Sequence, residues 1–543
     1  MPAVLIRAIV LSLVASALTS TTAAETERGP VTLRITAEIR QLLSANGLAI
    51  TGFYEPDFLP AWVRGGKATV QAVAIIGAMK DAASKGLSAE EYDAAQWQQR
   101  LDSLRAATPR DIALFDVTLT ECLVRYASDL EFGRLPKAGT DAVLPELVAW
   151  LRERLPNSSD PILQLNGLEP PFPGYRRTLE ALQHYRVLAS QNDRELLPAV
   201  LRPARPGPAK PAPIKPGDTW SGIPRLARLL QLLGDLPAHA TASLDVYQEP
   251  LVSAVSRYQQ RHGLDSDGRI GPTTIASLNT PLTRRVRQLE LTLERWREAP
   301  RSFSRPPIVV NIPEFTLHAL NEKYGTELQM KVVAGKAYGH QTPVFMAEMK
   351  YVIFRPYWDV PISIVRRELL PHLQKDAGYL VRNHYEVVNR AEDVVTGDVA
   401  GSDFTDRLAS GVYRIRQTPG KDNALGGVKF MFPNEHDIYL HGTPAVELFS
   451  KTRRDFSHGC IRVEKPEELA RWVLRGKKEW TPERIHAAMN GDKPVRVDLD
   501  QPIPVLIVYG TAVVAENGEV FFLDDIYGLD AKLEKTLSVS RQF

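Results

Sequence analysis

The sequence predicts a multidomain α+β protein with a helical N-terminal part, a three-helix module and a mostly-β C-terminal part that carries a helical insertion. Apolar residues recur with a helical period up to about residue 200. Six prolines then fall between residues 203 and 217. From about residue 305, short β-branched and aromatic runs replace the helical pattern. A chain of 543 residues exceeds what one hydrophobic core usually holds, so several domains are expected.

The first 24 residues have the layout of a secretory signal peptide. Arg7 precedes an apolar run over residues 8–18, and small residues ending at Ala24 follow. The run is about half the roughly 20 residues that a membrane-spanning helix needs. We therefore expect cleavage after Ala24 and a periplasmic mature protein, with an uncleaved anchor as the alternative.

Charge excludes some kinds of partner. The net charge is +2 at pH 7, and charged residues make up 24% of the chain. Proteins that bind nucleic acid or membrane surfaces through electrostatics carry a basic excess, which this chain lacks. We expect no nucleic-acid partner.

Composition and periodicity place the domain boundaries. Residues 305–500 are expected to form the β-rich domain. The helical stretch inserted at residues 361–405 is expected to serve as a lid. Asn517-Gly518 predicts a hairpin turn near the C-terminus. The expected segments are a signal peptide (1–24), a helical scaffold domain (25–202), a Pro-rich linker (203–220), a three-helix module (221–283), a connecting helix (284–304), the β-rich domain (305–500) with its lid insertion (361–405), and a C-terminal β-hairpin segment (501–543).

The two cysteines have different surroundings. Cys122 shares one helical face with Phe115, Leu119, Leu123, Tyr126 and Leu130, which predicts a buried core position. Cys460 lies in no periodic run and follows a glycine. A disulfide between them is not excluded by the sequence, although burial of Cys122 in a separate helical domain argues against it.

The residues around Cys460 suit nucleophilic chemistry. A thiol is mostly protonated at neutral pH, so a nucleophilic cysteine needs a base or a positive environment. His441, nineteen residues earlier on the predicted strand DIYLHGT, is the candidate base. His458 and Arg462 stand beside the thiol and are expected to lower its pKa. The flexible turn at Gly459 can aim backbone N–H groups at a developing oxyanion.

Two other interpretations stay open. A zinc site is conceivable because imidazole and thiolate are zinc ligands. Its four ligands would be His436, His441, His458 and Cys460, whose spacing matches no familiar zinc pattern. The second alternative is a buried structural thiol, for which the polar neighbours of Cys460 are unusual.

Two stretches resemble known families. AVSRYQQRHGLDSDGRIGPTTIASLN, within the three-helix module, resembles a peptidoglycan-binding domain, and Asp267, Gly268 and Thr273 are among the residues that carry the likeness. The pattern His441-Gly442 followed by Ser457-His458-Gly459-Cys460-x-Arg462 resembles the catalytic signature of L,D-transpeptidases. Because it also has an N-terminal helical domain and a module that resembles a peptidoglycan-binding domain, the whole chain resembles the large periplasmic branch of that family.

The resemblance implies roles for individual residues. Cys460 would be the nucleophile, His441 the general base, and the N–H groups near Gly459 and Cys460 the oxyanion donors. Gly442 has no side chain to orient the base, so a backbone carbonyl must fix its tautomer. The remaining implied residues are His458 and Arg462 around the thiol, and Tyr439, Trp358 and Ser457 along the substrate cleft.

The implied reaction is acyl transfer without a metal or cofactor. The enzyme would release D-Ala from tetrapeptide stems, form a thioester, and pass the acyl group to a neighbouring stem as a 3→3 cross-link. Water or a lipoprotein lysine as acceptor would make it a carboxypeptidase or an anchoring enzyme. The implied partners are peptidoglycan stem peptides and glycan, with other periplasmic wall-synthesis proteins as further candidates. A zinc wall peptidase and a non-enzymatic wall-binding scaffold are the rival classes.

Overall fold

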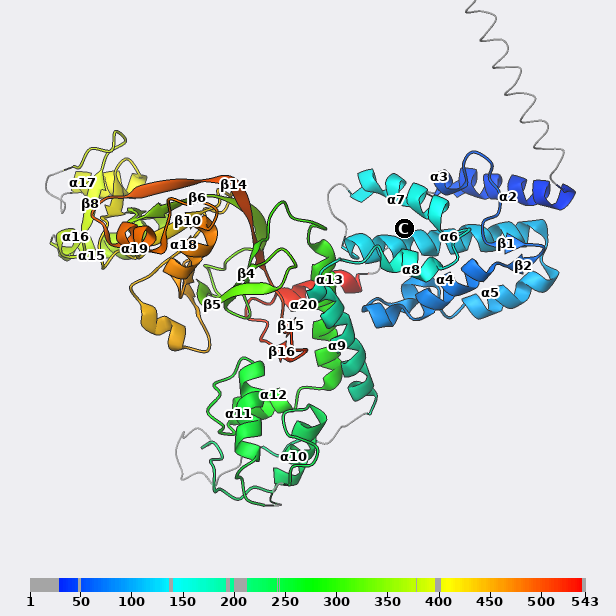
Figure 1. Cartoon of the computed structure of the whole chain (residues 1–543), viewed down its shortest axis with the longest axis horizontal. Helices are drawn as coiled ribbons and strands as arrows, with labels where there is room; N and C mark the ends of the chain where they lie inside the picture. Colours follow the sequence, from blue (N-terminus) through cyan, green and yellow to red (C-terminus); the bar gives the residue numbers. More distant parts are fainter. Residues whose placement is uncertain are drawn as a thin grey trace, which may run out of the picture. The chain divides into compact units, whose positions relative to one another are not determined.

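The structure is a computed structural model that describes residues 29–46, 50–135, 140–191, 196–199, 212–241, 243, 245–376, 378–395 and 402–539. The contacts divide the chain into two compact units (Figure 1). The first comprises Met1–Pro171, Leu293–Ala299 and Thr536–Phe543, and the second comprises Phe172–Thr292 and Pro300–Lys535. The expected signal peptide lies outside the described residues. Among those described, no helix is both long enough and apolar enough to cross a bilayer.

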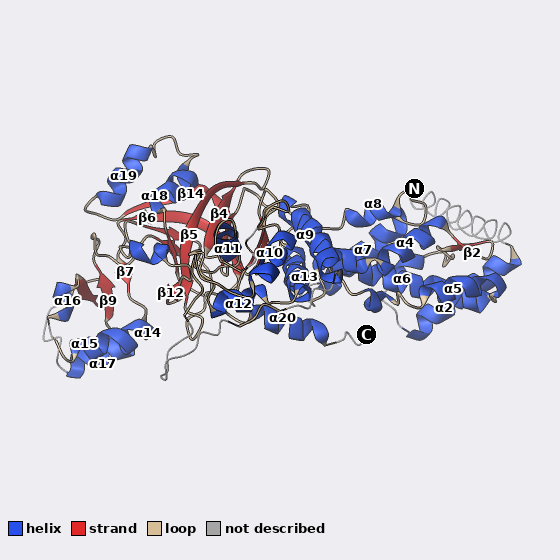
Figure 2. Cartoon of the chain, turned by 90° about the horizontal axis from the view of Figure 1, so that it is seen from below, coloured by secondary structure: helices blue, strands red, loops and turns tan. Residues whose placement is uncertain are grey.

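The first unit is built from helices, as the sequence predicts (Figure 2). The longest, α6, packs against α2 and α7. A pair of two-residue strands, β1 (Val63–Arg64) and β2 (Lys67–Ala68), forms a small hairpin. The helices are α2 (Pro30–Asn46), α3 (Thr51–Tyr54), α4 (Val70–Lys80), α5 (Trp97–Ser103), α6 (Pro109–Phe132), α7 (Thr140–Arg154) and α8 (Pro161–Asn166).

Local sequence signals determine the limits of α6. The Thr108 side chain accepts from the Asp111 amide while the Asp111 carboxylate accepts from the Thr108 amide, which is a capping box. Gly133 follows the last turn with a φ of +81°, in the region that favours glycine. Cys122 on this helix is 4% exposed, so its predicted place in the core is confirmed. Both cysteines are free thiols.

A buried carboxylate ties α6 to the loop that precedes β1. Asp116 is fully buried, and its two oxygens accept from the backbone amides of Ala61 (3.0 Å) and Trp62 (2.7 Å). The Tyr54 hydroxyl donates to the same carboxylate at 2.9 Å. Thr120 completes the network by accepting from the Trp62 indole at 2.8 Å. These bonds satisfy groups that burial would otherwise leave without partners.

The helix α9 (Pro173–Ser190) belongs to the second unit by its contacts, although the predicted scaffold range includes it. The Phe172 ring at its N-terminus lies edge-on to Tyr324, with ring centroids 4.9 Å apart. Tyr185 lies edge-on to Phe522 at 4.9 Å. Aromatic packing against residues far along the chain thus overrides proximity in sequence.

The three-helix module lies in the second unit. Its helices are α10 (Ile223–Leu232), α11 (Leu251–Arg261) and α12 (Pro272–Leu278), and they enclose one small apolar core. Inside it, Arg261 forms a buried ion pair with Asp235. Next comes α13 (Leu282–Glu298), where the sequence predicts a connecting helix.

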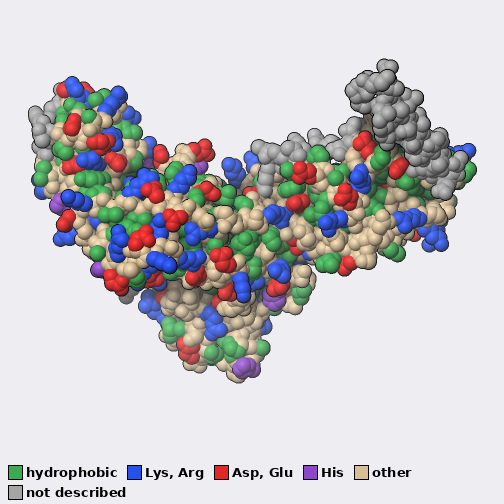
Figure 3. All heavy atoms as spheres, turned by 45° about the horizontal axis from the view of Figure 1, so that its top comes forward, with side chains coloured by type: hydrophobic (Ala, Val, Ile, Leu, Met, Phe, Trp, Pro, Cys, Tyr) green, Lys and Arg blue, Asp and Glu red, His purple; other side chains and the backbone are tan. Residues whose placement is uncertain are grey.

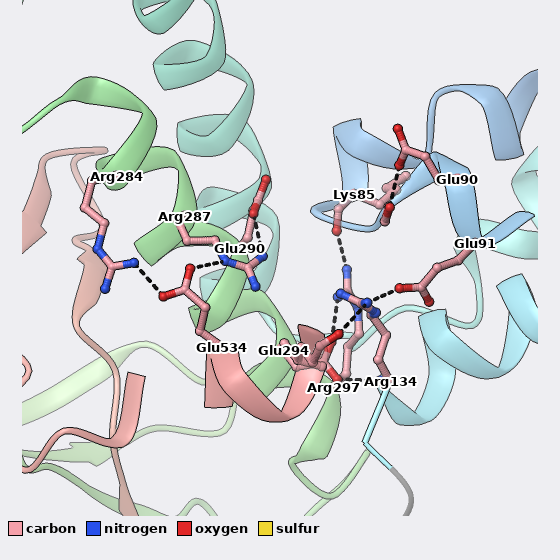
Figure 4. A network of polar contacts seen from close by, with 12 residues as sticks. Lys85, Glu90, Glu91, Arg134, Arg284, Arg287, Glu290, Glu294, Arg297 and Glu534 are labelled. Carbon is pink, nitrogen blue, oxygen red and sulfur yellow. Dashed lines mark hydrogen bonds and ion pairs between the residues drawn. The ribbon is translucent and has the colours of Figure 1, made fainter. Parts of the chain in front are cut away.

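Ion pairs along α13 fall into two groups (Figure 4). In the second unit, Glu534 accepts from Arg284 at 2.7 Å and from Arg287 at 3.0 Å. The first unit contains the last turn of α13, where Glu294 accepts from the Arg134 amide and pairs with Arg297 at 3.4 Å.

A nine-stranded sheet forms the body of the second unit, in the order β12-β5-β13-β11-β10-β6-β14-β3-β4. Because β4 also pairs with β5, every strand except β12 lies on a closed circuit. The strands are β3 (Ile308–Asn311), β4 (Thr316–Leu320), β5 (Thr326–Gly335), β6 (Phe345–Phe354), β10 (Val428–Met431), β11 (Leu440–His441), β12 (Asp455–Ser457), β13 (Ile461–Val463) and β14 (Val495–Val508).

Helices cover part of this sheet. The apolar face of α18 (Pro466–Leu474) joins the sheet core through Leu469, Val473 and Leu474. The next helix, α19 (Pro482–Asn490), adds Ile485 to the same core. On the face drawn in Figure 3, basic and acidic side chains are interspersed, which agrees with the net charge of +2.

The insertion is larger and less helical than predicted. Its own sheet, β7-β9-β8, consists of β7 (Trp358–Asp359), β8 (Tyr385–Val388) and β9 (Arg414–Gln417), so it extends past residue 405. Val387 and Ile415 enter a separate apolar core, which explains why these strands pair with each other. The helical segments are α14 (Ile362–Ile364), a π-helical turn (Val365–Leu369), α15 (Leu370–Leu373), α16 (Tyr379–Arg382) and α17 (Ser402–Ser410).

Strand β14 crosses the predicted C-terminal boundary at residue 500 and pairs with both β6 and β3. The predicted hairpin is present as β15 (Ala512–Val514) and β16 (Val520–Phe522), with Gly518 in its turn at a φ of +85°. A final helix, α20 (Leu529–Ser538), was not predicted.

The Asp116 network predicts a specific stability loss. Asp116→Ala leaves the Ala61 and Trp62 amides without their acceptor, at about 1–3 kcal/mol per buried group, while the Tyr54 hydroxyl keeps its contact with Thr120. We expect the first unit to lose about 3 kcal/mol or more, measured by denaturant unfolding. Asp81→Ala, which removes an exposed carboxylate, is the control. Equal stability of the two variants would contradict this account.

Candidate active site

Strand register places three basic side chains in a row. Lys429 on β10 pairs with His441 on β11, and His441 pairs with Arg462 on β13. Directly paired residues point to the same face of a sheet, and that face recurs every second residue. Tyr439 and Cys460 therefore share the face of His441 and Arg462. The ladder continues to them, because the Ile461 amide donates to the Tyr439 carbonyl at 3.1 Å.

The imidazole of His441 is buried and held by one hydrogen bond. It is 4% exposed, and its Nδ1 donates to the carbonyl of Gly442 at 2.5 Å. A carbonyl only accepts, so Nδ1 carries the proton and Nε2 is left as an acceptor. Burial, followed by the positive charge of Arg462, lowers the pKa of His441 to about 3. The ring is therefore neutral at physiological pH, as a general base must be.

Little space is left for a side chain at the residue after this histidine. A Cβ on Gly442 would lie 3.3 Å from the Leu425 carbonyl oxygen and 3.5 Å from Pro466. The Gly442 amide is held by the Val428 carbonyl at 3.0 Å. The residue is fixed on both sides, and its carbonyl is the backbone group that the sequence left unidentified.

The thiol of Cys460 is half-buried, and its Sγ donates to the Asp437 carbonyl at 3.7 Å. Burial raises the pKa of Cys460 above its usual value, and hydrogen bonds from the backbone and side chain of Tyr439 oppose that rise. The positive charge of Lys429 opposes it as well. The expectation of a lowered thiol pKa is therefore wrong, since burial outweighs the neighbouring charges.

The turn before Cys460 is held by side chains. Ser457 Oγ accepts from the Gly459 amide at 3.1 Å and donates to the Cys460 carbonyl at 2.6 Å. Thr342 Oγ1 donates to the Gly459 carbonyl at 2.7 Å. Gly459 has a φ of +123°, where a side chain would be strained. Its amide is engaged, so of the two expected oxyanion donors only the Cys460 amide has no acceptor among the described residues.

Lys429 is a site residue that sequence reasoning missed. Its Nζ lies 5.6 Å from the centre of the Tyr439 ring, and burial lowers its pKa. Among the described residues neither Lys429 nor Arg462 forms an ion pair, and the buried Nε of Arg462 has no hydrogen-bond partner there. VKFMF does predict a strand, but only the pairing with β11 reveals that Lys429 faces the site.

The other predicted site residues lie in different surroundings. His458 turns toward the insertion, where its Nε2 lies 2.6 Å from the Glu368 carboxylate and its ring is edge-on to His340. Trp358 pairs with Gln417 and packs against the core of the insertion. Both residues therefore contact the insertion, whereas Tyr439 contacts His441 with ring centroids 5.7 Å apart.

The residues singled out in the three-helix module mostly build a turn. The Asp267 carboxylate accepts from the Arg269 amide at 2.9 Å, and the Gly268 amide donates to Gln259 at 2.8 Å. A Cβ on Gly268 would lie 3.0 Å from Val252. Thr273 is exposed near the start of α12.

The zinc interpretation needs His436, His441, His458 and Cys460 to converge. Within the part of the chain that the structure describes, no group of three or more His, Cys, Asp or Glu side chains is arranged to hold a metal ion. His436 instead lies edge-on to Phe345, with centroids 5.1 Å apart.

The raised pKa of Cys460 predicts slow alkylation. We expect iodoacetamide to modify Cys460 in the native protein with a pH midpoint above about 8.5, the value of a free thiol. Tyr439→Phe removes a group that lowers this pKa, so its midpoint should be higher still. Tyr338→Phe, at a side chain that is 92% exposed, is the control. Cys122 should stay unmodified, and a native midpoint at or below 8.5 would contradict the account.

Three family models match the chain in order. Residues 49–182 match a scaffold domain, residues 221–278 match a "putative peptidoglycan binding domain", and residues 305–497 match an L,D-transpeptidase catalytic domain. A protein of Haemophilus influenzae named "Putative L,D-transpeptidase" is 34% identical over 226 residues. That alignment covers 42% of this chain and 45% of the relative, so the chain spans about half the length of the curated protein it matches.

Proposed function

We propose that this protein is a cysteine L,D-transpeptidase that cross-links peptidoglycan, with Cys460 as nucleophile and His441 as general base. The observation that carries the proposal is the single-tautomer imidazole, which shares a sheet face with the only half-exposed thiol of the chain. The family match of residues 305–497 supplies the reaction class.

The first step forms a thioester. As Sγ of Cys460 attacks the carbonyl between the third stem residue and terminal D-Ala, its proton passes to Nε2 of His441. The C–S bond forms while the carbonyl electrons move onto oxygen, near the Cys460 amide. When the C–N bond breaks, His441 returns the proton to the departing amine, and D-Ala leaves.

The charges around the site favour this step, and burial disfavours an ion pair between the thiolate and the imidazolium before substrate binds. Burial keeps both the thiol and the imidazole neutral before substrate binds. Negative charge then develops beside Lys429 and Arg462, whose half-buried cations interact with it more strongly than they would in water. The cations are thus placed to stabilise the transition state rather than the free enzyme.

The second step transfers the acyl group. A side-chain amine from a neighbouring stem attacks the thioester carbonyl and gives a proton to His441, and Cys460 leaves with a proton returned to sulfur. The product is a 3→3 cross-link. Water in place of the amine gives L,D-carboxypeptidase activity, and a lipoprotein lysine gives an anchoring reaction. Such substrates lie outside the cytosol, which supports a periplasmic location with residues 1–24 as the export signal.

The insertion is proposed to control which acceptor enters. Its π-helical turn carries Glu368, whose carboxylate reaches His458 two residues before the nucleophile. Lids commonly exclude water from a reactive intermediate. A hydrogen bond that holds the insertion against the signature turn would favour transfer to an amine over hydrolysis.

Cysteine chemistry is tested with purified disaccharide-tetrapeptide and intact-protein mass spectrometry. We expect an adduct on Cys460 that lacks D-Ala, followed by cross-linked dimers. Cys460→Ala should abolish both, and His441→Gln should slow turnover by about 10²–10⁴-fold, the usual contribution of a general base. Cys122→Ala, which removes the other thiol, is the matched control. The proposal would be refuted if both the protein and the substrate remained unmodified. It would also be refuted if a chelator abolished the activity.

The lid is tested by product partition. Glu368→Gln removes the charge that His458 contacts, so we expect more hydrolysed tripeptide relative to cross-linked dimer. Asp403→Asn removes an exposed ion pair within α17 of the same insertion and should leave the ratio unchanged. An unchanged ratio for Glu368→Gln would exclude this role of the contact.

A further inference from the structure

A cavity separate from the thiol lies in the second unit. It has a volume of about 360 Å³ and forms where α9, the three-helix module and the first turn of α13 meet. That volume falls within the roughly 300–1,000 Å³ typical of small-molecule sites. None of the residues assigned to the chemistry of Cys460 lines it.

The charged side chains among the described lining residues are arginines. Arg225 and Arg285 line the cavity, and none of the described lining residues is acidic. Arg285 donates to the Gln288 amide oxygen at 2.9 Å and to Ser277 at 3.3 Å, and its guanidinium lies over the Phe522 ring at 5.0 Å. These partners are all neutral, so they orient the guanidinium without neutralising it. Such a group favours a carboxylate ligand.

Aromatic and apolar groups form the remaining wall. The Tyr258 and His262 rings are stacked 3.7 Å apart, and the Tyr258 hydroxyl contacts Ser277 at 3.0 Å. Burial and the charge of Arg285 lower the pKa of His262 well below its usual value, so this ring adds no charge. Leu229 and Leu278 line the same cavity. The lining suits a short peptide with small apolar side chains and a free carboxylate.

The turn that contains Asp267 and Gly268 differs from the cavity wall in how its polar groups are used. Asp267 and Gly268, which carry much of the family likeness, are engaged in bonds within their own turn. Tyr258 and Leu278 carry the likeness as well, and both line the cavity. The module residues that carry the likeness are thus divided between the turn and the cavity wall.

We propose that this cavity is a second binding site, which holds a carboxylate-bearing peptide end of the wall polymer through Arg285. The identity of the polymer rests on the proposed function. The site itself rests on the shape and charge of the cavity. Its chemical class of ligand is a short peptide carboxylate.

Binding of the full-length protein to purified sacculi in a sedimentation assay tests the site. Arg285→Gln removes the charge, and Thr283→Trp adds bulk at an exposed lining residue. Each should weaken binding about tenfold or more, the scale of one charge-assisted hydrogen bond. Arg284→Gln removes the same charge from the neighbouring residue, which pairs with Glu534 instead, and should bind like the unmodified protein.

Chemical modification of the sacculi tests whether the bound group is a carboxylate. Sacculi whose carboxylates have been converted to neutral amides should bind the unmodified protein as weakly as untreated sacculi bind Arg285→Gln. Amidation should add little further loss in that variant, because the interacting pair is already broken. Full binding by both Arg285→Gln and Thr283→Trp, or full binding to amidated sacculi, would overturn the site.

Turnover separates this proposal from the previous one. All three variants should process soluble disaccharide-tetrapeptide at the unmodified rate, because the cavity is not part of the thiol site. If no variant and no unmodified protein turned over substrate while the sacculus binding pattern stayed as expected, the proposed transpeptidase function would be refuted. The proposed binding site in the cavity would not be affected. If thermal unfolding shows that Arg285→Gln does not fold, Thr283→Trp decides the outcome.

Discussion

The hydrogen bond from His441 Nδ1 to the Gly442 carbonyl is the contact on which the proposed chemistry depends. A buried ring N–H without an acceptor costs free energy, so this bond both stabilises the fold and selects one tautomer. A Cβ at position 442 would make a close contact of 3.3 Å with the Leu425 carbonyl oxygen, so glycine fits there with the least adjustment.

The same burial sets the charge state of the site. Removing water raises the pKa of the thiol and lowers that of the imidazole, so neither group is charged at rest. Lys429 and Arg462 remain beside them without carboxylate partners among the described residues. In the proposed reaction, these cations would interact most strongly with the charge that appears in the transition state, where such an interaction accelerates the reaction.

Local patterns predicted much of the fold, and they led to the proposal of Cys460 and His441 as the principal site residues. The helix containing Cys122, the Asn517-Gly518 turn and most of the strands follow from periodicity, caps and turn residues, which act over a few positions. Strand pairing acts over long distances, so the position of Lys429 beside His441 was not visible. The same holds for His458, which contacts Glu368 ninety residues earlier in the chain. The hydrogen bonds of Ser457 within the turn before Cys460 were not predicted either.

A polymeric partner changes what a second site has to do. Peptidoglycan repeats the same peptide along its length, so a weak contact at the module would raise the local concentration of stems near Cys460 without altering the chemistry. Tight binding there would slow movement to the next stem. A cavity whose proposed contact is the single guanidinium of Arg285 is suited to that intermediate strength, because one charge-assisted contact contributes only a few kcal/mol.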